Sequence, residues 1–138
     1  LLANQALNGF IGSGVPQDWA THMIGHELTA FYGLDHAQSL AVVQPYLLRV
    51  MIEDKKEKLT LMGKEVFNMP QNYEMVIEAI EYTYQSIGVP TKLSAYKTDD
   101  KVIKNVTSSL EKHGMTALGE NGNITLDKVS QILEMSMK

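Results

Sequence analysis

The chain has 138 residues, of which 44% are hydrophobic, and a formal net charge of -4, so it is long enough for one globular domain with a substantial core. It contains no cysteine, which excludes disulfides, thiolate metal sites and cysteine nucleophiles and leaves His, Asp and Glu as metal ligands. Its 12 basic residues form no stripe against the 16 acidic ones, so we expect no nucleic-acid partner. No apolar run reaches the roughly 18 to 20 residues of a membrane span, and the first residues do not resemble a signal peptide. We therefore expect a cytoplasmic protein without a membrane partner.

Apolar residues recur with helical periodicity along the chain, and breakers separate the periodic segments. No segment has the sustained period-two alternation of a strand. The sequence therefore predicts an all-α domain of about six to seven helices, with no internal repeat or linker to divide it. The predicted helices are 2–10, 19–32, 35–53, 54–67, 73–87, 98–113 and 125–137.

Individual residues predict where these helices begin, end or bend. Asp18 and Thr98 are the expected N-terminal caps, and Gly33 and Pro70 are expected stops. Pro45 has no backbone N–H and is expected to kink or split the third helix. In the second helix, the apolar positions expected to face the core are Trp19, Met23, Leu28 and Phe31.

Three of the four histidines, His22, His26 and His36, lie within fifteen residues. His22 and His26 are one helical turn apart, so both imidazoles can approach one ion or substrate, and the turn at Gly33 can bring His36 to the same point. The alternative is that these histidines are structural and hydrogen-bond within the core. Gly25 costs a helix about 1 kcal/mol relative to Ala, which predicts the close approach of a neighbouring helix or of a bound molecule.

The histidine spacing does not match that of a metalloprotease. In the H-E-x-x-H motif the Glu follows the first His and acts as general base. Here Met23 follows His22, and Glu27 follows His26 instead. A metal-dependent hydrolase is therefore a less favoured alternative, and the base it would need beside the ion is Glu27.

Four stretches of the sequence carry a family resemblance. The run GVPQDWATHMIGHELTA at 14–30, continued by YGLDHAQ at 32–38, resembles the signature of iron-containing (group III) alcohol dehydrogenases. GVPTKLS at 88–94 and HGMTALGEN at 113–121 resemble the branch of NADPH-dependent aldehyde reductases and butanol dehydrogenases. The resemblance implies the helical half of a dehydroquinate synthase-like subunit. We therefore expect a single helical metal-binding domain at 1–138, a fragment without the family's N-terminal nucleotide-binding domain.

The resemblance also implies roles for the histidines. His22 and His36 match two of the family's metal ligands, the others being an Asp and a His upstream of this sequence. The implied metal, Fe²⁺ or Zn²⁺, thus joins His22 to His36 rather than to His26. His26 matches a position near the nicotinamide and the substrate, which makes it the candidate catalytic and cofactor-binding residue. Asp35 and Glu27 are candidates for orienting an imidazole, and equally for a helix cap or a solvated charge.

The activity implied by the resemblance is that of an alcohol dehydrogenase, which interconverts aldehydes and primary alcohols by hydride transfer. The implied cofactor is NADP(H) rather than NAD(H), bound mainly by the absent N-terminal domain. We expect this chain alone to be inactive and to bind metal weakly, because it offers two of four ligands, and the full-length protein to be a homo-oligomer. The other class of function left open is a helical structural or interaction module whose histidine cluster is structural.

Overall fold

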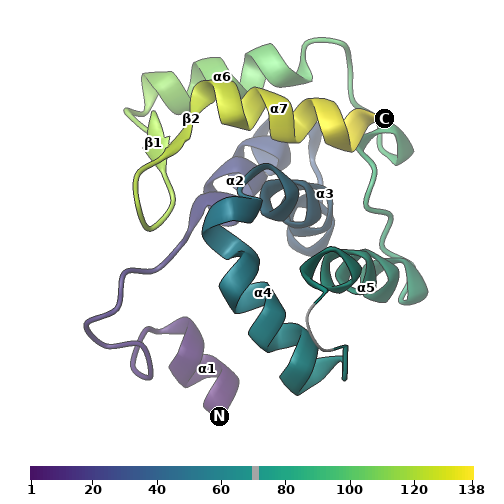
Figure 1. Ribbon diagram of the computed structural model, residues 1–138. Coiled ribbons are helices and arrows are strands. Elements are labelled where there is room, and N and C mark those ends of the chain that lie inside the picture. The colour runs from purple at the N-terminus through teal and green to yellow at the C-terminus, as the bar shows by residue number, and fades with distance from the viewer. Residues whose placement is uncertain (70–71) are drawn as a thin grey trace.

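The fold is built almost entirely of helices (Figure 1). A computed structural model describes residues 1–69 and 72–138, and these residues form seven α-helices, one short 3-10 helix and one two-stranded sheet. The predicted all-α class is confirmed, while the predicted stop at Pro70 lies outside the described residues. The elements are α1 (Leu2–Leu7), α2 (Ala20–Tyr32), α3 (His36–Val50), α4 (Ile52–Val66), α5 (Tyr73–Ser86), the 3-10 helix (Leu93–Ala95), α6 (Val102–Lys112), β1 (Ala117–Leu118), β2 (Ile124–Thr125) and α7 (Leu126–Met137).

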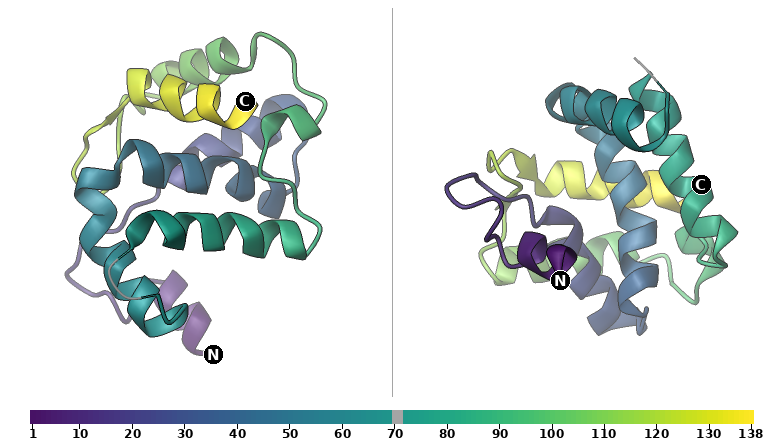
Figure 2. Two further views of the ribbon diagram at one scale, coloured as in Figure 1. Left: turned by 45° about the vertical axis from the view of Figure 1, so that its right-hand side comes forward. Right: turned by 90° about the horizontal axis from the view of Figure 1, so that it is seen from below.

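Helix α3 lies at the centre of the molecule, with α7 above it and α5 below it in the left view of Figure 2. It packs against α2, α5 and α7. Most of the main core is formed by buried apolar side chains from α2, α3, α6 and α7, and a smaller cluster joins α4 to α5. Helix α1 lies apart from the central helix α3 (Figure 1). Fully buried members of the two clusters include Ile24, Val43, Val106, Leu133 and Val76.

Helix α2 buries a different face from the predicted one. Of the predicted positions, Leu28 is fully buried and Met23 is half-buried against the core. Trp19 and Phe31, however, remain 37% and 48% exposed, so the prediction that they face the core is wrong. The stripe that is buried in the main core instead carries smaller side chains than Trp19 and Phe31. That buried stripe consists of Ala20, Ile24 and Leu28, spaced four residues apart.

Helix α3 runs through Pro45 without interruption and ends at Val50. Pro45 is buried, and its missing N–H deprives one carbonyl of a helical donor, a cost of about 3 kcal/mol that the packing of this central helix offsets. The chain divides instead at Met51, whose φ of -102° and ψ of 23° end α3 and precede α4. The predicted third helix is therefore split, but at Met51 rather than at Pro45.

The predicted helix ends agree with the structure at Gly33 but not at Thr98. Gly33 adopts the left-handed conformation, with φ of 68°, and its N–H closes the last turn of α2. Helix α6 begins at Val102 rather than near Thr98, and Asp99 Oδ1 accepts a hydrogen bond from the Lys101 N–H at 3.0 Å just ahead of it. Thr98 is therefore not the cap that the sequence predicts.

The sheet of β1 and β2 is a finding that the sequence did not predict. It pairs Ala117 with Thr125 and Leu118 with Ile124 in antiparallel register. Two residues per strand are too few to show an alternating pattern, which explains why periodicity misses it. None of the helices in the described part of the chain is both long and apolar enough to cross a membrane.

Candidate metal centre

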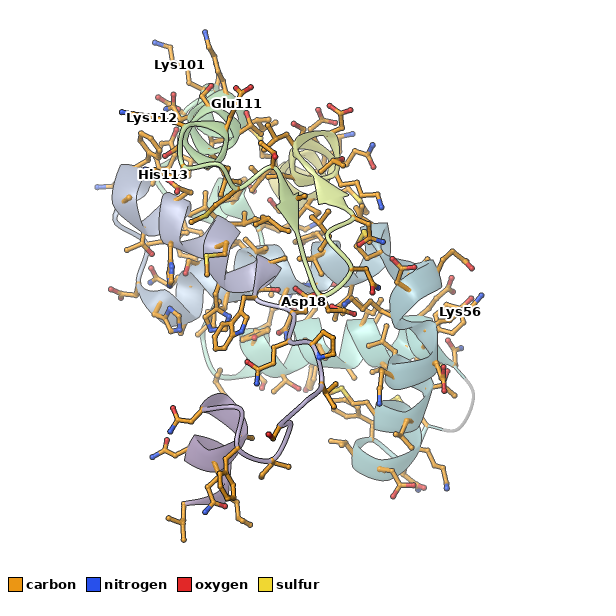
Figure 3. The ribbon with its side chains drawn as sticks, turned by 90° about the vertical axis from the view of Figure 1, so that its left-hand side faces the viewer. Asp18, Lys56, Lys101, Glu111, Lys112 and His113 are labelled. Atoms are coloured by element: carbon orange, nitrogen blue, oxygen red, sulfur yellow. The ribbon has the colours of Figure 1, made fainter. Side chains whose placement is uncertain are left out.

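Three imidazoles meet beside the turn that connects α2 to α3. The ring centroids of His22 and His36 are 5.3 Å apart, and His26 lies 6.3 Å from His22 and 6.2 Å from His36. His22 is half-buried, whereas His26 and His36 are exposed. The structure thus brings all three predicted site residues together. The fourth histidine, His113, lies elsewhere, at the C-terminal end of α6 (Figure 3).

A close helix contact beside these rings sets the distance between α2 and α3. Gly25 is buried on α2, and a Cβ atom added to it would meet Ser39 Oγ of α3 at 3.1 Å. Ser39 is fully buried and donates a hydrogen bond to the His36 carbonyl at 2.9 Å, so its hydroxyl has little room to move away. Gly25 therefore permits the close approach that the sequence predicts, and the neighbour is a helix.

The two carboxylates predicted as possible partners of the imidazoles have other roles. Asp35 is the N-cap residue of α3, and its N–H donates to the Gln38 side-chain oxygen at 2.9 Å, as in a capping box. Glu27 is buried, and its Oε1 lies 3.2 Å from His113 Nδ1. Asp35 therefore acts as a helix cap, and Glu27 is paired away from the cluster. Neither carboxylate hydrogen-bonds His22, His26 or His36.

The surroundings of His22 favour its neutral form. Burial lowers the pKa of the His22 imidazole, and the nearby rings of His36 and His26 lower it further, because protonation would place positive charges side by side. A neutral imidazole is the form that binds a metal ion. His22 therefore stays neutral, and able to bind a metal ion, at a lower pH than an isolated histidine would.

Trp19 and a cavity border His22. The indole meets the His22 ring edge-on, with centroids 5.2 Å apart, and its Nε1 donates to Gln17 Oε1 at 3.0 Å. A cavity of about 310 Å³ opens beside them, lined also by Ala6 and Asp18. Sequence reasoning missed this role by assigning Trp19 to the core. The available signal was its position three residues before His22, which places both side chains on one helical face.

The imidazole pair of His22 and His36 fits half of a metal site. Two imidazoles on one tetrahedral zinc, with Zn–N bonds of about 2.0 Å, have ring centroids about 5 Å apart, and the pair is separated by 5.3 Å. Imidazole suits both iron and zinc. Within residues 1–69 and 72–138, no group of three or more His, Asp or Glu side chains is arranged to hold a metal ion. A complete site would need ligands from beyond these residues.

The helical fold agrees with the results of comparison with known families. The chain belongs to the Fe-containing alcohol dehydrogenase family, because the model of that family's C-terminal part matches residues 3–137. The family resemblance of the histidine-bearing sequence is thereby confirmed. The comparison does not test the assignment of individual residues as ligands.

Individual members of the family resemble this chain in sequence and in structure. The NADPH-dependent aldehyde reductase YqhD of Escherichia coli (strain K12) is 49% identical over 137 residues, which cover 96% of this chain and 35% of that protein. The crystal structure of E. coli K-12 YqhD superposes with a TM-score of 0.92 at 48% identity, covering 97% of this chain and 36% of that chain. NADH-dependent butanol dehydrogenase A from Thermotoga maritima superposes with a TM-score of 0.85 at 26% identity, covering 99% and 37%. The chain thus spans about a third of the length of these relatives.

Proposed function

We propose that the chain is the metal-binding helical domain of an NADPH-dependent aldehyde reductase, which interconverts aldehydes and primary alcohols by hydride transfer. The observation that carries the proposal is the 5.3 Å separation of the His22 and His36 rings in a chain of the Fe-containing alcohol dehydrogenase family. The 49% identical relative is named as NADPH-dependent, which supports NADP(H) over NAD(H). The chain spans about a third of that relative. We therefore assign nucleotide binding, the remaining metal ligands and homo-oligomeric assembly to a longer protein.

In this proposal His22 and His36 hold the metal, and His26 does not. The His22–His36 separation fits two ligands of one ion, whereas His26 lies 6.3 Å and 6.2 Å from these rings. The spacing of His22 and His26 along the helix alone would have favoured the other pairing. The ion is iron, as the family's name indicates, or zinc. When bound, it supplies Lewis-acid polarisation of the aldehyde oxygen. The lowered pKa of His22 keeps that ligand neutral and able to bind.

His26 is assigned the proton transfer that accompanies the hydride transfer. It is exposed on α2, one turn beyond His22, where a substrate on the metal side of the cluster comes within reach. A ring N–H of His26 delivers a proton to the oxygen that becomes the alcohol hydroxyl, and in the reverse direction the ring accepts it. The same ring orients the nicotinamide. Trp19 and the adjoining cavity form an apolar wall and an opening next to His22.

Two observations weigh against the other functions that the sequence left open. Structural histidines are expected to be buried and hydrogen-bonded, yet among the histidines of the described residues only His113 hydrogen-bonds another side chain. A hydrolase would need a base beside the ion, and Glu27 is paired with His113. A hydrolase would nevertheless be identified if the protein turned over substrate without any nucleotide and Glu27→Gln abolished that turnover.

Variants of the full-length protein test the assignment. His22→Ala and His36→Ala are expected to lose bound metal and NADPH-dependent aldehyde reduction together. His26→Ala is expected to retain the metal and to lower kcat by roughly 10²- to 10⁴-fold, the usual contribution of a general acid. His113→Gln, which lies outside the cluster, is the control and is expected to keep both. Undiminished reduction in His22→Ala and His36→Ala, with only a lower Tm, would favour a structural cluster.

A further inference from the structure

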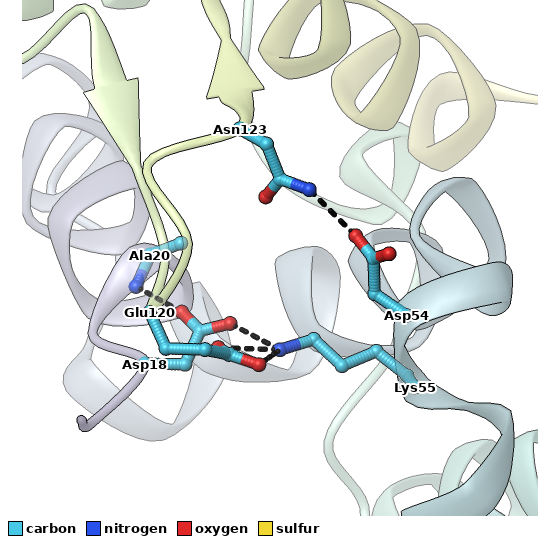
Figure 4. A network of polar contacts seen from close by, with 6 residues as sticks. All are labelled: Asp18, Ala20, Asp54, Lys55, Glu120 and Asn123. Atoms are coloured by element: carbon cyan, nitrogen blue, oxygen red, sulfur yellow. Dashed lines mark hydrogen bonds and ion pairs between the residues drawn. The ribbon is translucent and has the colours of Figure 1, made fainter. Parts of the chain in front are cut away.

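Lys55 joins three segments that are far apart in the sequence (Figure 4). Its Nζ, on the first turns of α4, donates to Asp18 Oδ2 at 2.6 Å and to both carboxylate oxygens of Glu120 at 2.6 Å. Asp18 precedes α2, and Glu120 lies in the loop between β1 and β2. The side chains of Lys55, Asp18 and Glu120 are only 14%, 20% and 26% exposed. These contacts are therefore better shielded from solvent than a typical surface ion pair.

Asp18 connects this network to the helix that carries His22. Its Oδ1 accepts a hydrogen bond from the Ala20 N–H at 2.8 Å, at the first residue of α2. One carboxylate thus both satisfies the N-terminus of α2 and binds it to α4 through Lys55. His22 follows Ala20 by two residues, and its ring lies against Trp19. The network therefore acts within one turn of His22.

On the α4 side, the network is connected to His36 through the whole length of α3. Helix α4 follows α3 after the single residue Met51, and α3 begins at His36. Lys55 therefore ties the start of α2 to the same α3–α4 segment that carries His36. The other end of α2 is fixed to α3 by the turn at Gly33. With both ends of α2 fixed, the network limits how far His22 can move relative to His36.

The charges make Lys55 indispensable to this arrangement. Two carboxylates share one ammonium group, so without Lys55 they would repel each other across a partly shielded contact. Burial alone would raise the pKa of Asp18, but its hydrogen bonds with the Lys55 ammonium and the Ala20 N–H outweigh burial, so the pKa lies below its ordinary value. Burial alone would lower the pKa of Lys55, and the two carboxylates raise it above its ordinary value instead.

The β1–β2 loop is built to deliver Glu120 to this point. Gly119 has φ of 84°, and a Cβ atom added there would lie 3.0 Å from Ile124 Cδ1 and 3.7 Å from Asp18 Oδ2. A second hydrogen bond, from Asn123 Nδ2 to Asp54 Oδ2 at 2.6 Å, holds the same loop on α4 (Figure 4). The loop is thus held on α4 at two points.

We propose that Lys55, held by Asp18 and Glu120, is a positioning residue that fixes the start of α2 and so sets the placement of His22 against His36. Lys55 touches neither imidazole and acts through Asp18 and the first turn of α2. The metal-binding consequence rests on the proposed function, whereas the placement of the His22 ring does not.

The neighbouring lysine provides a matched control. Lys56 is exposed and pairs with Glu53 of its own helix, at 2.7 Å, and its side chain points outward from α4 in Figure 3. The full chain, without metal, is compared as wild type, Lys55→Met and Lys56→Met by NMR. Lys55→Met is expected to lose the contact between the Trp19 and His22 ring protons and to shift the His22 ring resonances. Lys56→Met is expected to match the wild type.

Zinc titration of the same proteins gives the second readout. A direct partner of a metal ligand contributes 10- to 100-fold in affinity, and Lys55 acts through a helix turn, so we expect about a tenfold higher Kd for Lys55→Met. Glu120→Gln keeps the Lys55–Asp18 pair and should change both readouts in the same direction by less. If Lys55→Met fails to fold, the result for Glu120→Gln tests the positioning role in its place.

The outcomes separate the two proposals. A lower Tm in Lys55→Met or Glu120→Gln with unchanged Trp19–His22 contacts, ring shifts and zinc Kd would overturn the positioning role. If zinc leaves His22 and His36 of the wild type unaffected while Lys55→Met still displaces the His22 ring, the metal assignment fails and the positioning role stands.

Discussion

Replacing Gly25 with alanine probes the helix contact that holds the histidine cluster together. At an exposed helix position this change would stabilise the protein by about 1 kcal/mol through helix propensity. Here the new methyl group would lie 3.1 Å from the Ser39 hydroxyl, which is buried and hydrogen-bonded to the His36 carbonyl. Overpacking of this kind costs about 1 to 3 kcal/mol. We therefore expect Gly25→Ala to be destabilising by about 1 kcal/mol.

Removing the obstructing hydroxyl should reverse the sign. In a Ser39→Ala background the nearest atom to the new methyl group is the residue-39 Cβ at 3.4 Å, an ordinary contact, so Gly25→Ala should then stabilise by about 1 kcal/mol. The double-mutant cycle thus predicts a coupling of about 2 kcal/mol, measured by urea unfolding of the four proteins. Equal stabilisation by Gly25→Ala in both backgrounds would refute the close contact between α2 and α3.

Two further predictions concern proton binding and the turn between the helices. Folding lowers the pKa of His22 below its ordinary 6.5, so the unfolded chain binds more protons; the contribution to stability is complete above pH 6.5 and is lost as the pH falls through the folded pKa. Urea unfolding at a series of pH values should show this loss of unfolding free energy in the wild type and a smaller loss in His22→Ala. The same pH dependence in both proteins would contradict the prediction. Gly33→Ala should lower the free energy of unfolding by about 1 kcal/mol, because φ is 68° there and no atom lies within 4 Å of an added Cβ. Gly33→Asn, which tolerates this conformation, should cost less, and an equal cost would point to a cause other than backbone strain.

The helical segments were predictable because their signals are local. Apolar periodicity and the left-handed glycine at Gly33 act over a single turn, and the structure places α2 accordingly. The exposure of Trp19 was not predictable in this way, because α2 has two apolar stripes and only its packing against the neighbouring helices decides which one is buried. The break at Met51 rather than at Pro45 likewise depends on the packing of α3 between its neighbours.

In the candidate site, too, the local features were predictable from the sequence and the contacts between distant segments were not. The density of His22, His26 and His36 in the sequence predicted a cluster, and the Gly25 prediction of a close neighbour is confirmed by Ser39. Spacing along one helix favoured the wrong nearest pair, since the α2–α3 turn places His36 nearer to His22 than His26 is. The contacts of Lys55 join residues 37 and 65 positions apart, a separation at which no sequence pattern indicates contact.

The assignment of His22 and His36 as metal ligands is tested most directly by titrating the chain with Zn²⁺, and with Fe²⁺ under anaerobic conditions, while the imidazole nitrogens of all four histidines are followed by NMR. We expect His22 and His36 to respond together at the same metal concentration, with His26 shifting little and His113 not at all. A paired response of His22 and His26, or silence of His22 and His36 at millimolar metal, would contradict the account.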